Sequence, residues 1–358
     1  MKNPFIKISQ CGAQFTDASC SINRVQIAKL PVYGVEDKIE GKAVSEIFSV
    51  DVITEDIKKN ADALEIELDK FSERGLIFEF VKKISDGSEA AISLMRKYGR
   101  RLGMIFLTLK TGLPENQNAR SDWNQGCWEY WKSVKRVILV GGLTSGVMGT
   151  IMKAEALSVF EQAGVEPYEF ILFDNASFVG IMGAAAQIKE KDGTFIVFDF
   201  GQTNLKRSIV KKRSGEIVEV KMLDSLPSKY MQKMKADDSI AQEEAQKLDL
   251  YLRRCIADTI GYVSHSDEIS GEIIISIANY VCDGSLNAER GGYAKLKSIC
   301  DNYGEYLENE LSGQLRKRVS VRLIHDSTAA ALYFCDYNDS VCITIGTAFG
   351  IGFPEIQP

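Results

Sequence analysis

The run best suited to chemistry places an acid, a glycine, a hydroxyl and a lysine close together: Asp199-Phe200-Gly201-Gln202-Thr203-Asn204-Leu205-Lys206. Its glycine lets the backbone approach a phosphate closely, and consecutive amide N–H groups form a small anion-binding concavity. Thr203 adds a hydroxyl donor and Lys206 a cation. Asp199 follows an apolar stretch and suits a water-mediated hold on Mg²⁺, which keeps most of its hydration shell. The alternative is an ordinary hairpin whose Asp and Asn satisfy turn amides.

Two further turns have a composition that suits phosphate or nucleotide binding. Gly346 and Thr347 lie in the run Ile343–Gly352, where three glycines and a threonine follow a predicted strand. Gly141 and Gly142 stand where the predicted strand 137–140 runs into a helix, a geometry that presents free amides at a helix N-terminus. The alternative for the first turn is a glycine-rich connection between buried strands.

A fourth segment, His325-Asp326-Ser327-Thr328, also joins a predicted strand to a helix. Asp326 at this point is a candidate general base that accepts a proton from a substrate hydroxyl as it attacks phosphorus. The alternative is a helix N-cap, a role that Ser327 or Thr328 would fill equally well. His325 is one of two histidines and is more typical of a packed or surface imidazole, although its position beside Asp326 makes it a candidate substrate contact.

The second half of the chain alternates strands and helices. Strands are predicted at 195–200, 205–211 and 216–222, with Ser214-Gly215 as a hairpin turn, then at 272–278, 319–324 and 340–345. Helices are predicted from Ala241 to Ile256, over 294–311 and over 327–334. The resulting order, βββαβαβα followed by a further strand, is typical of an α/β fold with a largely parallel sheet.

The first half is more helical. Helices are predicted over 61–85, 90–108 and 144–162, the second ending at Lys110-Thr111-Gly112, and strands over 137–140 and 170–173. Residues 176–186 begin a helix of small side chains, which suits either a flat ligand or tight packing on a sheet. The three tryptophans lie between residues 116 and 131, where we favour an insertion that covers a core edge over an adenine-stacking box.

Composition excludes several classes of function. The 358 residues carry 43 Lys+Arg and 49 Asp+Glu, a net charge of −6 without any long block of one sign, so nucleic acid is a poor candidate partner. The longest uncharged stretches, residues 137–152 and 340–354, are shorter than the roughly 20 residues that span a bilayer. Eight scattered cysteines indicate reduced, mostly buried thiols without a structural zinc site. Without a recognisable signal peptide over residues 1–10, we expect a cytoplasmic protein of two domains that uses no membrane.

Together these four segments resemble the superfamily of sugar kinases, actin and heat-shock chaperone ATPases, and most closely its ROK family of repressors and sugar kinases. The run 199–206 is similar to that family's first phosphate motif, Gly346–Gly352 to its second, and Gly141-Gly142 to its adenosine motif. Asp326 stands where the family carries its catalytic aspartate. The resemblance implies a two-lobed, actin-like ATPase fold of the ribonuclease H-like type. It also implies ATP, Mg²⁺ and a sugar-like small-molecule substrate.

The resemblance implies the following nucleotide- and phosphate-binding residues: Asp199, Gly201, Gln202, Thr203, Asn204, Lys206, Gly346, Thr347, Gly141 and Gly142.

The motifs occur in an unusual order, because the family places its adenosine motif last and this sequence places it first. A circular permutation explains the order, with the family's usual start near Thr194. Permutation is physically tolerable where chain ends lie exposed and close together. The expected domains are residues 1–190 as the adenosine-motif lobe, 191–345 as the lobe with the first phosphate motif and catalytic Asp, and 346–358 as a tail returning to the first lobe.

Several positions depart from the family pattern. The cysteine-rich run of its zinc-binding kinases and the preceding Glu-x-Gly-His segment are missing, His325 replaces an Asn, and Gln202 and Asn204 replace Gly and Lys. The nucleotide machinery is therefore better supported than the sugar pocket. We predict an ATP-dependent kinase that phosphorylates a hydroxyl of a sugar-like molecule. The alternatives are a non-catalytic nucleotide or sugar sensor and a phosphotransferase for small acids; a homodimer is left open.

Overall fold

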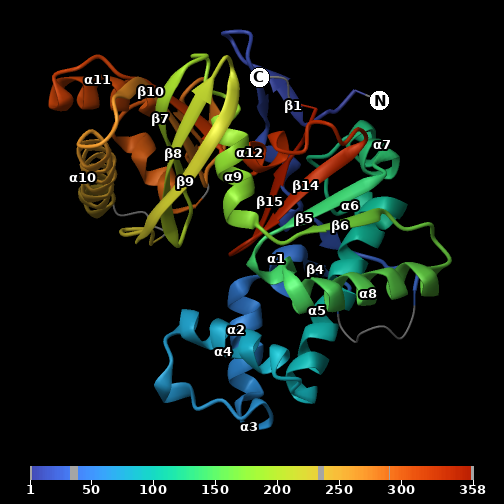
Figure 1. The fold of residues 1–358 in the computed structure, drawn as a ribbon. Helices are drawn as coiled ribbons and strands as arrows, with labels where there is room; N and C mark the ends of the chain where they lie inside the picture. The colour runs from blue at the N-terminus through green and yellow to red at the C-terminus, as the bar shows by residue number, and fades with distance from the viewer. Residues whose placement is uncertain (1, 33–38, 233–237, 290, 356–358) are drawn as a thin grey trace. The chain divides into compact units, whose positions relative to one another are not determined.

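The structure is a computed structural model that describes residues 2–32, 39–232, 238–289 and 291–355. The chain divides into two compact units (Figure 1). Unit 1 consists of the described residues of Met1–Phe5, Ser19–Ala176 and Asp339–Ile351, and unit 2 of those of Ile6–Ala18, Ser177–Asn338 and Gly352–Pro358. Each unit contains its own sheet with parallel strands, so the α/β class predicted from the sequence is confirmed.

Unit 2 is built on a five-stranded sheet in the order β13-β10-β7-β8-β9. Its strands are β7 (Gly193–Phe200), β8 (Asn204–Arg213), β9 (Glu216–Pro227), β10 (Ile269–Ile277) and β13 (Ser320–His325). Strands β7, β10 and β13 are mutually parallel, whereas β8 runs antiparallel to both of its neighbours. Counted along the chain from β7, the order is 3-2-1-4-5 with the second strand reversed, which is the ribonuclease H-like arrangement.

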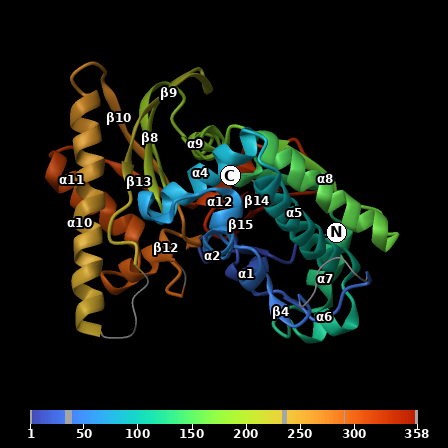
Figure 2. The same ribbon diagram turned by 90° about the horizontal axis from the view of Figure 1, so that it is seen from below.

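Helices cover both faces of this sheet, which explains why β10 reads as a nearly continuous apolar run. Leu248 and Leu252 of α10 and Leu307 of α11 join one core cluster, and Figure 2 shows these helices beside the sheet. Ile181 of α9 and Ala329 of α12 join the cluster on the other face. The remaining elements of unit 2 are α9 (Ala176–Ala185), α10 (Asp238–Val263), α11 (Tyr303–Leu315), α12 (Asp326–Leu332), η5 (Gly292–Ser298), β1 (Ile6–Ile8), β2 (Gln14–Thr16), β11 (Val281–Cys282) and β12 (Ser285–Leu286).

Unit 1 contains a four-stranded sheet in the order β15-β14-β5-β6. Its strands are β5 (Arg136–Val140), β6 (Glu169–Phe173), β14 (Ser340–Ile345) and β15 (Phe349–Gly352), of which β14, β5 and β6 are parallel. The other elements are β3 (Gln26–Ile27), β4 (Lys42–Ala43), η1 (Ala18–Cys20), η2 (Ile22–Arg24), η3 (Leu68–Lys70), η4 (Gly142–Thr144), α1 (Val44–Ile47), α2 (Val50–Lys59), α3 (Ala61–Leu64), α4 (Glu73–Ser85), α5 (Glu89–Thr111), α6 (Pro114–Asn118), α7 (Gln125–Ser133) and α8 (Gly146–Ala163).

The strand order in unit 1 is that of a permuted ribonuclease H-like sheet. When β14 and β15 are counted first and second, and β5 and β6 fourth and fifth, the sheet reads 2-1-4-5. Unit 2 has the same order with a third strand added. In the chain, however, β5 and β6 precede β14 and β15. The strands that such a unit uses last therefore come first here, as the order of the motifs predicts.

The structure corrects two of the predicted helices. The helix predicted over 61–85 is wrong as one element. Helix α3 ends at Leu64, and its C-cap residue Glu65 adopts the left-handed conformation (φ 53°). A new helix, α4, starts after Ser72, whose side chain caps it by accepting from the Gly75 amide. The helix predicted over 294–311 is divided into η5 and α11, because Asn302 caps α11 through the Glu305 amide. Side chains that satisfy backbone amides set both helix starts.

The boundary between the units lies at Ala176 and Ser177, whereas the sequence pattern placed it at 190. Helix α9 belongs to unit 2 because Ile181, Ala184 and Ala185 share a core with Phe195 and Val197 of β7. At the other end the boundary follows Asn338 rather than residue 345. None of the described helices combines the length and apolar composition that a bilayer span requires.

Close packing of two helices in unit 1 depends on glycine. Helices α5 and α8 run side by side (Figure 2), and a Cβ atom placed on Gly103 of α5 would lie 2.8 Å from both the Cα and the carbonyl oxygen of Ala156 in α8. A side chain at residue 103 would therefore push against backbone. Gly261 in α10 has no neighbouring atom within 4 Å of such a Cβ.

Replacing Gly103 with Ala is expected to lower the free energy of unfolding by about 1–3 kcal/mol, because the added methyl overpacks the α5–α8 contact. The control, Gly261→Ala, is expected to be neutral or to stabilise by up to about 1 kcal/mol, because alanine is the better helix former. Urea denaturation of both variants measures the difference. Equal effects of the two substitutions would show that the helices are not packed through Gly103.

Candidate functional site

The candidate site of unit 2 lies where its parallel strands end. The register pairs Asp199 of β7 with Ser276 of β10, and Ile277 of β10 with His325 of β13. Parallel strands deliver their carboxyl ends to one edge of the sheet, which is where open α/β sheets bind ligands. Residues that are far apart in sequence, Asp199 and Asp326 among them, are brought together at this edge.

Asp199 is buried, with 8% of its surface exposed, and its carboxylate is fully engaged. Oδ2 accepts a hydrogen bond from Nζ of Lys206 (2.7 Å), and Oδ1 accepts from Oγ of Ser276 (3.1 Å). Lys206 stands directly opposite Asp199 on β8. A buried carboxylate is tolerated only when it is paired and hydrogen-bonded, and this one is. The sequence analysis placed Asp199 and Lys206 in one candidate phosphate turn, but it anticipated neither their ion pair nor the contact with Ser276.

The turn between β7 and β8 is braced from several directions. The Gly201 amide donates to the Asn204 carbonyl (3.0 Å), and the Gly201 carbonyl accepts from the hydroxyls of Ser228 (2.7 Å) and Tyr293 (2.9 Å). Gln202 donates to the carbonyl of Ala278 (3.2 Å) and accepts from the amide of Gly292 (3.3 Å), whereas Thr203 is exposed. The Gln202 side chain thus holds the turn in shape, and Thr203 is the turn residue open to solvent.

Ser228 and Tyr293 were missed by the sequence interpretation. Both donate to the same carbonyl, but Ser228 lies just after the last residue of β9, and Tyr293 is the second residue of the 3₁₀ helix η5. Burial raises the pKa of Tyr293 well above its usual value and outweighs the lowering by a hydrogen bond with Ser228, so the Tyr293 hydroxyl stays protonated and can donate. No local pattern marks either residue, because only the tertiary fold brings them to the turn.

Asp326 is the first residue of α12, and 32% of its side-chain surface is exposed to solvent. Oδ1 accepts from the amide (2.6 Å) and hydroxyl (3.1 Å) of Ser327. Surrounding protein atoms and the negative charge of Asp199 raise the pKa of Asp326 to about 7. A carboxyl group that exchanges its proton near neutral pH is suited to general base catalysis. Residue 325 occupies the N-cap position of α12 and no side chain caps the helix there, so the N-cap role that the alternative interpretation gives Asp326 is wrong.

His325 is buried beside Asp326. Its Nε2 lies 3.3 Å from Oδ1 of Asp326, its Nδ1 lies 3.0 Å from Oγ1 of Thr328, and its ring stacks on Tyr280 with a centroid separation of 4.4 Å. Burial lowers the pKa of His325 to about 3, so the imidazole is neutral at physiological pH. The packed imidazole predicted from the sequence is what the structure contains, in contact with the candidate base.

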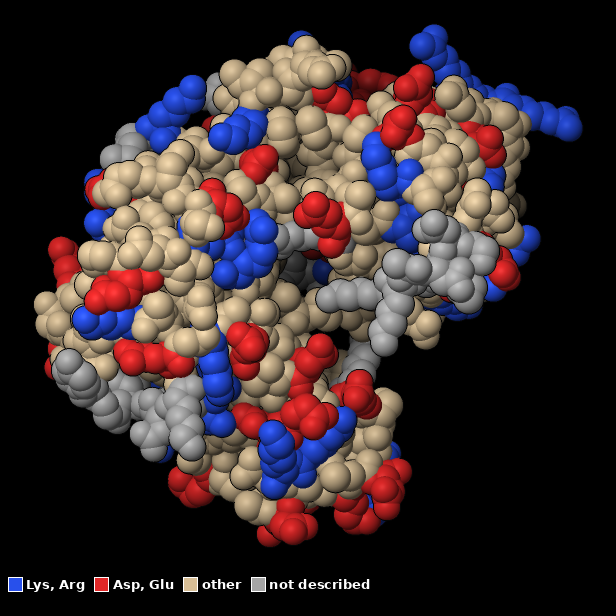
Figure 3. All heavy atoms as spheres, turned by 180° about the vertical axis from the view of Figure 1, so that it is seen from behind, with Lys and Arg blue, Asp and Glu red and all other residues tan. Residues whose placement is uncertain are grey.

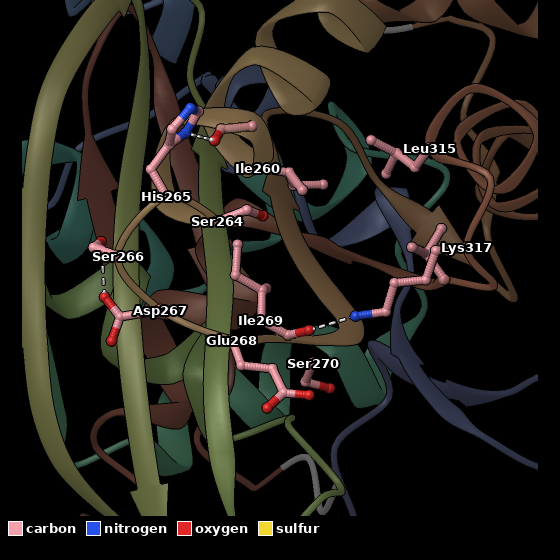
Figure 4. A pocket seen from close by; sticks show the side chains of 12 residues that line it. Ile260, Ser264, His265, Ser266, Asp267, Glu268, Ile269, Ser270, Leu315 and Lys317 are labelled. Carbon is pink, nitrogen blue, oxygen red and sulfur yellow. Dashed lines mark hydrogen bonds between the residues drawn. The ribbon is translucent and has the colours of Figure 1, made fainter.

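The second histidine, His265, is exposed, as predicted, and lines a surface hollow of about 640 Å³ (Figure 4). Lys317 in this hollow donates to the carbonyl of Ile269 (2.6 Å), the first residue of β10. The hollow therefore lies at the N-terminal ends of the parallel strands, at the edge of the sheet opposite to the one that holds Asp199 and Asp326. Its polar groups belong to a different part of unit 2.

The glycine turns of unit 1 also lie at one sheet edge, because Thr344, Val140 and Phe173 are in register across β14, β5 and β6. A Cβ on Gly141 would collide with the carbonyl of Ile345, so the close approach of two strand ends requires glycine there. Gly142 has no atom within 4 Å of such a Cβ and is open.

The turn that carries Gly346 and Thr347 lies against a helix start in the same unit. The Gly346 amide donates to the Ala348 carbonyl (3.3 Å), and the Thr347 carbonyl accepts from the amide of Val50, the first residue of α2 (3.3 Å). At the neighbouring turn, the Gly146 amide at the start of α8 donates to Oδ1 of Asp174 (2.9 Å). Two helix N-termini, those of α2 and α8, therefore lie at this edge.

No family model matches this sequence, and a search of curated proteins finds no match. Among solved structures, a chain of the PilM–PilN type IV pilus biogenesis complex is similar at 14% identity over 50% of this chain and 49% of that one, with a TM-score of 0.28. Ethanolamine utilization protein EutJ from Carboxydothermus hydrogenoformans is similar at 14% identity over 64% of this chain and 73% of that one, with a TM-score of 0.28. MreB5 of Spiroplasma citri bound to ADP is similar at 15% identity over 65% of this chain and 71% of that one, with a TM-score of 0.18. The fold assignment accordingly rests on the strand order of the two sheets.

The raised pKa of Asp326 makes a prediction about stability. Because the folded protein binds this proton more tightly than the unfolded chain, Asp326 contributes stability below about pH 4 that is lost as the pH rises to about 7. Asp326→Asn cannot ionise and is expected to raise the midpoint of thermal unfolding at pH 8 and to change it little at pH 4.

Asp56 is the matched control of opposite sign. Hydrogen bonds from Lys97 and Tyr98 outweigh its burial and lower its pKa, so Asp56→Asn should destabilise more at pH 8 than at low pH. Thermal unfolding of both variants from about pH 2.5 to pH 8 provides the comparison, because the contribution of Asp56 is lost only below its usual pKa of 3.8, whereas that of Asp326 changes between about pH 4 and pH 7. A stability gain for Asp326→Asn that is the same at every pH would contradict the assignment.

Proposed function

We propose that this protein is an ATP-dependent phosphotransferase in which Asp326 accepts the proton of an attacking hydroxyl. The proposal is carried by one juxtaposition: Asp326 stands beside the Asp199–Lys206 pair at the ligand-binding edge of a ribonuclease H-like sheet. Phosphoryl transfer needs positioned charge more than covalent chemistry, and this edge supplies the candidate base Asp326, the carboxylate of Asp199 and the cation of Lys206. The acceptor proposed from the sequence is a sugar-like small molecule.

The charge balance of the site suits a magnesium nucleotide. Two carboxylates face one ammonium, and after burial, which is the larger cause, the negative charge of Asp199 raises the pKa of Asp326. The described residues contain no cluster of three His, Cys, Asp or Glu side chains that would hold a metal by themselves. As the sequence analysis proposes, Mg²⁺ would be held through water near Asp199, in keeping with its preference for few protein ligands, and when bound it would neutralise phosphate charge.

The nucleotide contacts of unit 1 are proposed for Gly346, Thr347, Gly141 and Gly142. Their support is the open backbone at Gly142 and the two helix N-termini at the same edge, which favour anions. In unit 2, Gly201, Thr203 and Asn204 would present the β7–β8 turn to a phosphate, with Lys206 as the nearby cation.

The proposal includes neither nucleic acid nor a membrane as a partner. On the face drawn in Figure 3, basic and acidic side chains are interspersed rather than gathered into a basic stripe. Surface ion pairs, such as that of Lys58 with Glu55 and Glu73, also bring opposite charges together. A cytoplasmic location and a homodimer remain proposals from the sequence.

Replacing Asp326 with Ala is expected to lower kcat by about 10²–10⁴-fold, the range for loss of a general base, with little change in ATP affinity. A coupled assay over hexoses, N-acetylhexosamines, polyols and short carboxylic acids finds the acceptor, and calorimetry measures ATP binding. The control is Asp301→Ala, a side chain 99% exposed on the same unit. A variant that retained full turnover would remove Asp326 from this role.

The pH profile offers an independent check on the base. Asp326 must be ionised to accept a proton, and its pKa is about 7. The value of kcat/KM should therefore rise about tenfold per pH unit below pH 7 and level off above it. A flat profile between pH 5.5 and 8, measured under chemistry-limited conditions, would contradict general base catalysis by Asp326.

A non-catalytic sensor is the second candidate, and the ion pair of Asp199 favours it. Each carboxylate oxygen of Asp199 already accepts one hydrogen bond, from Lys206 at 2.7 Å and from Ser276 at 3.1 Å, so a metal ion would share this carboxylate with an ammonium group. ATP binding without turnover on any acceptor class would support the sensor. Turnover on sugars or polyols would support the kinase. Turnover on small acids alone would support a phosphotransferase for small acids.

A further inference from the structure

A chain of buried polar side chains leads from the N-terminal hairpin β1–β2 to Asp326. Thr16 Oγ1 lies 2.9 Å from Thr328 Oγ1, Thr328 Oγ1 lies 3.0 Å from Nδ1 of His325, and Nε2 of His325 lies 3.3 Å from Oδ1 of Asp326. Thr16, Thr328 and His325 are 2%, 5% and 6% exposed. All four residues belong to unit 2, although Thr16 and Thr328 are 312 positions apart.

The chemistry of the four groups allows one hydrogen-bond direction when Asp326 is ionised. A carboxylate can only accept, so at the 3.3 Å separation of Nε2 and Oδ1 a favourable contact places the proton of the neutral His325 ring on Nε2, facing Asp326. The neutral ring then has a lone pair on Nδ1, which accepts from the Thr328 hydroxyl. The oxygen of Thr328 is in turn the acceptor for Thr16. In this order Nδ1 of His325 has a donor, and the buried hydroxyls of Thr328 and Thr16 each have an acceptor.

The surroundings of His325 keep its ring neutral and fixed. Burial disfavours the imidazolium, and Tyr280 stacks on the ring at an interplanar angle of 22°. A polar network buried to this degree is costly unless every member is satisfied, which makes it sensitive to the loss of one hydroxyl. Packing by apolar side chains would serve stability alone at lower risk.

We propose that His325 is a positioning residue, which orients the Asp326 carboxylate through its Nε2–H and is held in that tautomer by Thr328 and Thr16. The β1–β2 hairpin, the first strand pair in the chain, thereby becomes part of the site. The catalytic consequence rests on the proposed function, whereas the hydrogen-bond chain itself does not. The two are tested separately.

The chain is tested by nitrogen-15 NMR of the two histidine rings at pH 8 in the full-length protein. His265 is an internal reference, because its Nδ1 lies 2.7 Å from the Gly261 carbonyl, which only accepts, so Nδ1 carries its proton. His325 is expected to show the opposite tautomer, with the proton on Nε2. A His325 ring protonated on Nδ1, or charged, would overturn the proposal.

Substitution of the hydroxyls tests the direction of the chain. Thr328→Val keeps the shape of the side chain and removes the donor to Nδ1 of His325. The nitrogen-15 chemical shift of Nδ1 should therefore move toward the value of an unprotonated ring nitrogen that accepts no hydrogen bond. Thr16→Val acts one step further and should give a smaller shift in the same direction. The control is Thr108→Val, a buried threonine in unit 1 that bonds the Met104 carbonyl. An unchanged Nδ1 resonance in Thr328→Val would refute the chain.

Kinetics distinguish positioning from a structural role. Thr328→Val is expected to lower kcat about threefold to tenfold with an unchanged KM for ATP, because one orienting hydrogen bond is lost. His325→Gln, which offers an N–H at similar reach, should retain more activity than His325→Leu. If the wild-type protein shows no turnover, the proposed function fails while the tautomer measurement still decides the chain. A confirmed tautomer with an unchanged kcat in every variant would reject positioning.

Discussion

The burial of Asp199 is the constraint on which the rest of the site depends. A carboxylate at the end of a central strand needs a cation and a donor, and the fold supplies them from the two neighbouring strands, Lys206 on β8 and Ser276 on β10. The ion pair therefore ties the hairpin to the parallel part of the sheet. It also sets the field that Asp326 experiences, because the charge of Asp199 helps to raise the pKa of Asp326.

Permutation leaves this arrangement intact for a simple reason. All five strands of the unit 2 sheet lie in one continuous segment of that unit, Ser177–Asn338. The register that aligns Asp199 with Ser276 and Ile277 with His325 is therefore formed within one stretch of chain. The sheet of unit 1 is the one assembled from two distant segments, with β14 added beside β5. The close contact between Gly141 and the carbonyl of Ile345 is a result of that joining, and glycine is the residue that permits it.

The parts of the fold and site that are local in sequence were predictable. The β7–β8–β9 hairpins follow from apolar alternation and from Ser214-Gly215, and the seven-residue spacing of Asp199 and Lys206 across a tight turn makes them cross-strand neighbours. Contacts made by Ser228 and Tyr293 were not predictable, because they depend on packing between elements far apart in the chain. Glu65 and Ser72 show the limit for helices: apolar periodicity continued through 61–85, but local backbone geometry and a cap divided it.

One physical cause, burial, acts in opposite directions on the two titratable groups at the end of β13. It penalises the charged form, so it raises the pKa of the Asp326 acid and lowers that of the His325 imidazole. A cationic imidazolium at 3.3 Å would hold Asp326 ionised and make it a weak base. A neutral ring orients the carboxylate without that electrostatic cost, so Asp326 keeps the ability to take up a proton near neutral pH. A buried His at residue 325 is thus compatible with base catalysis only because burial keeps it neutral.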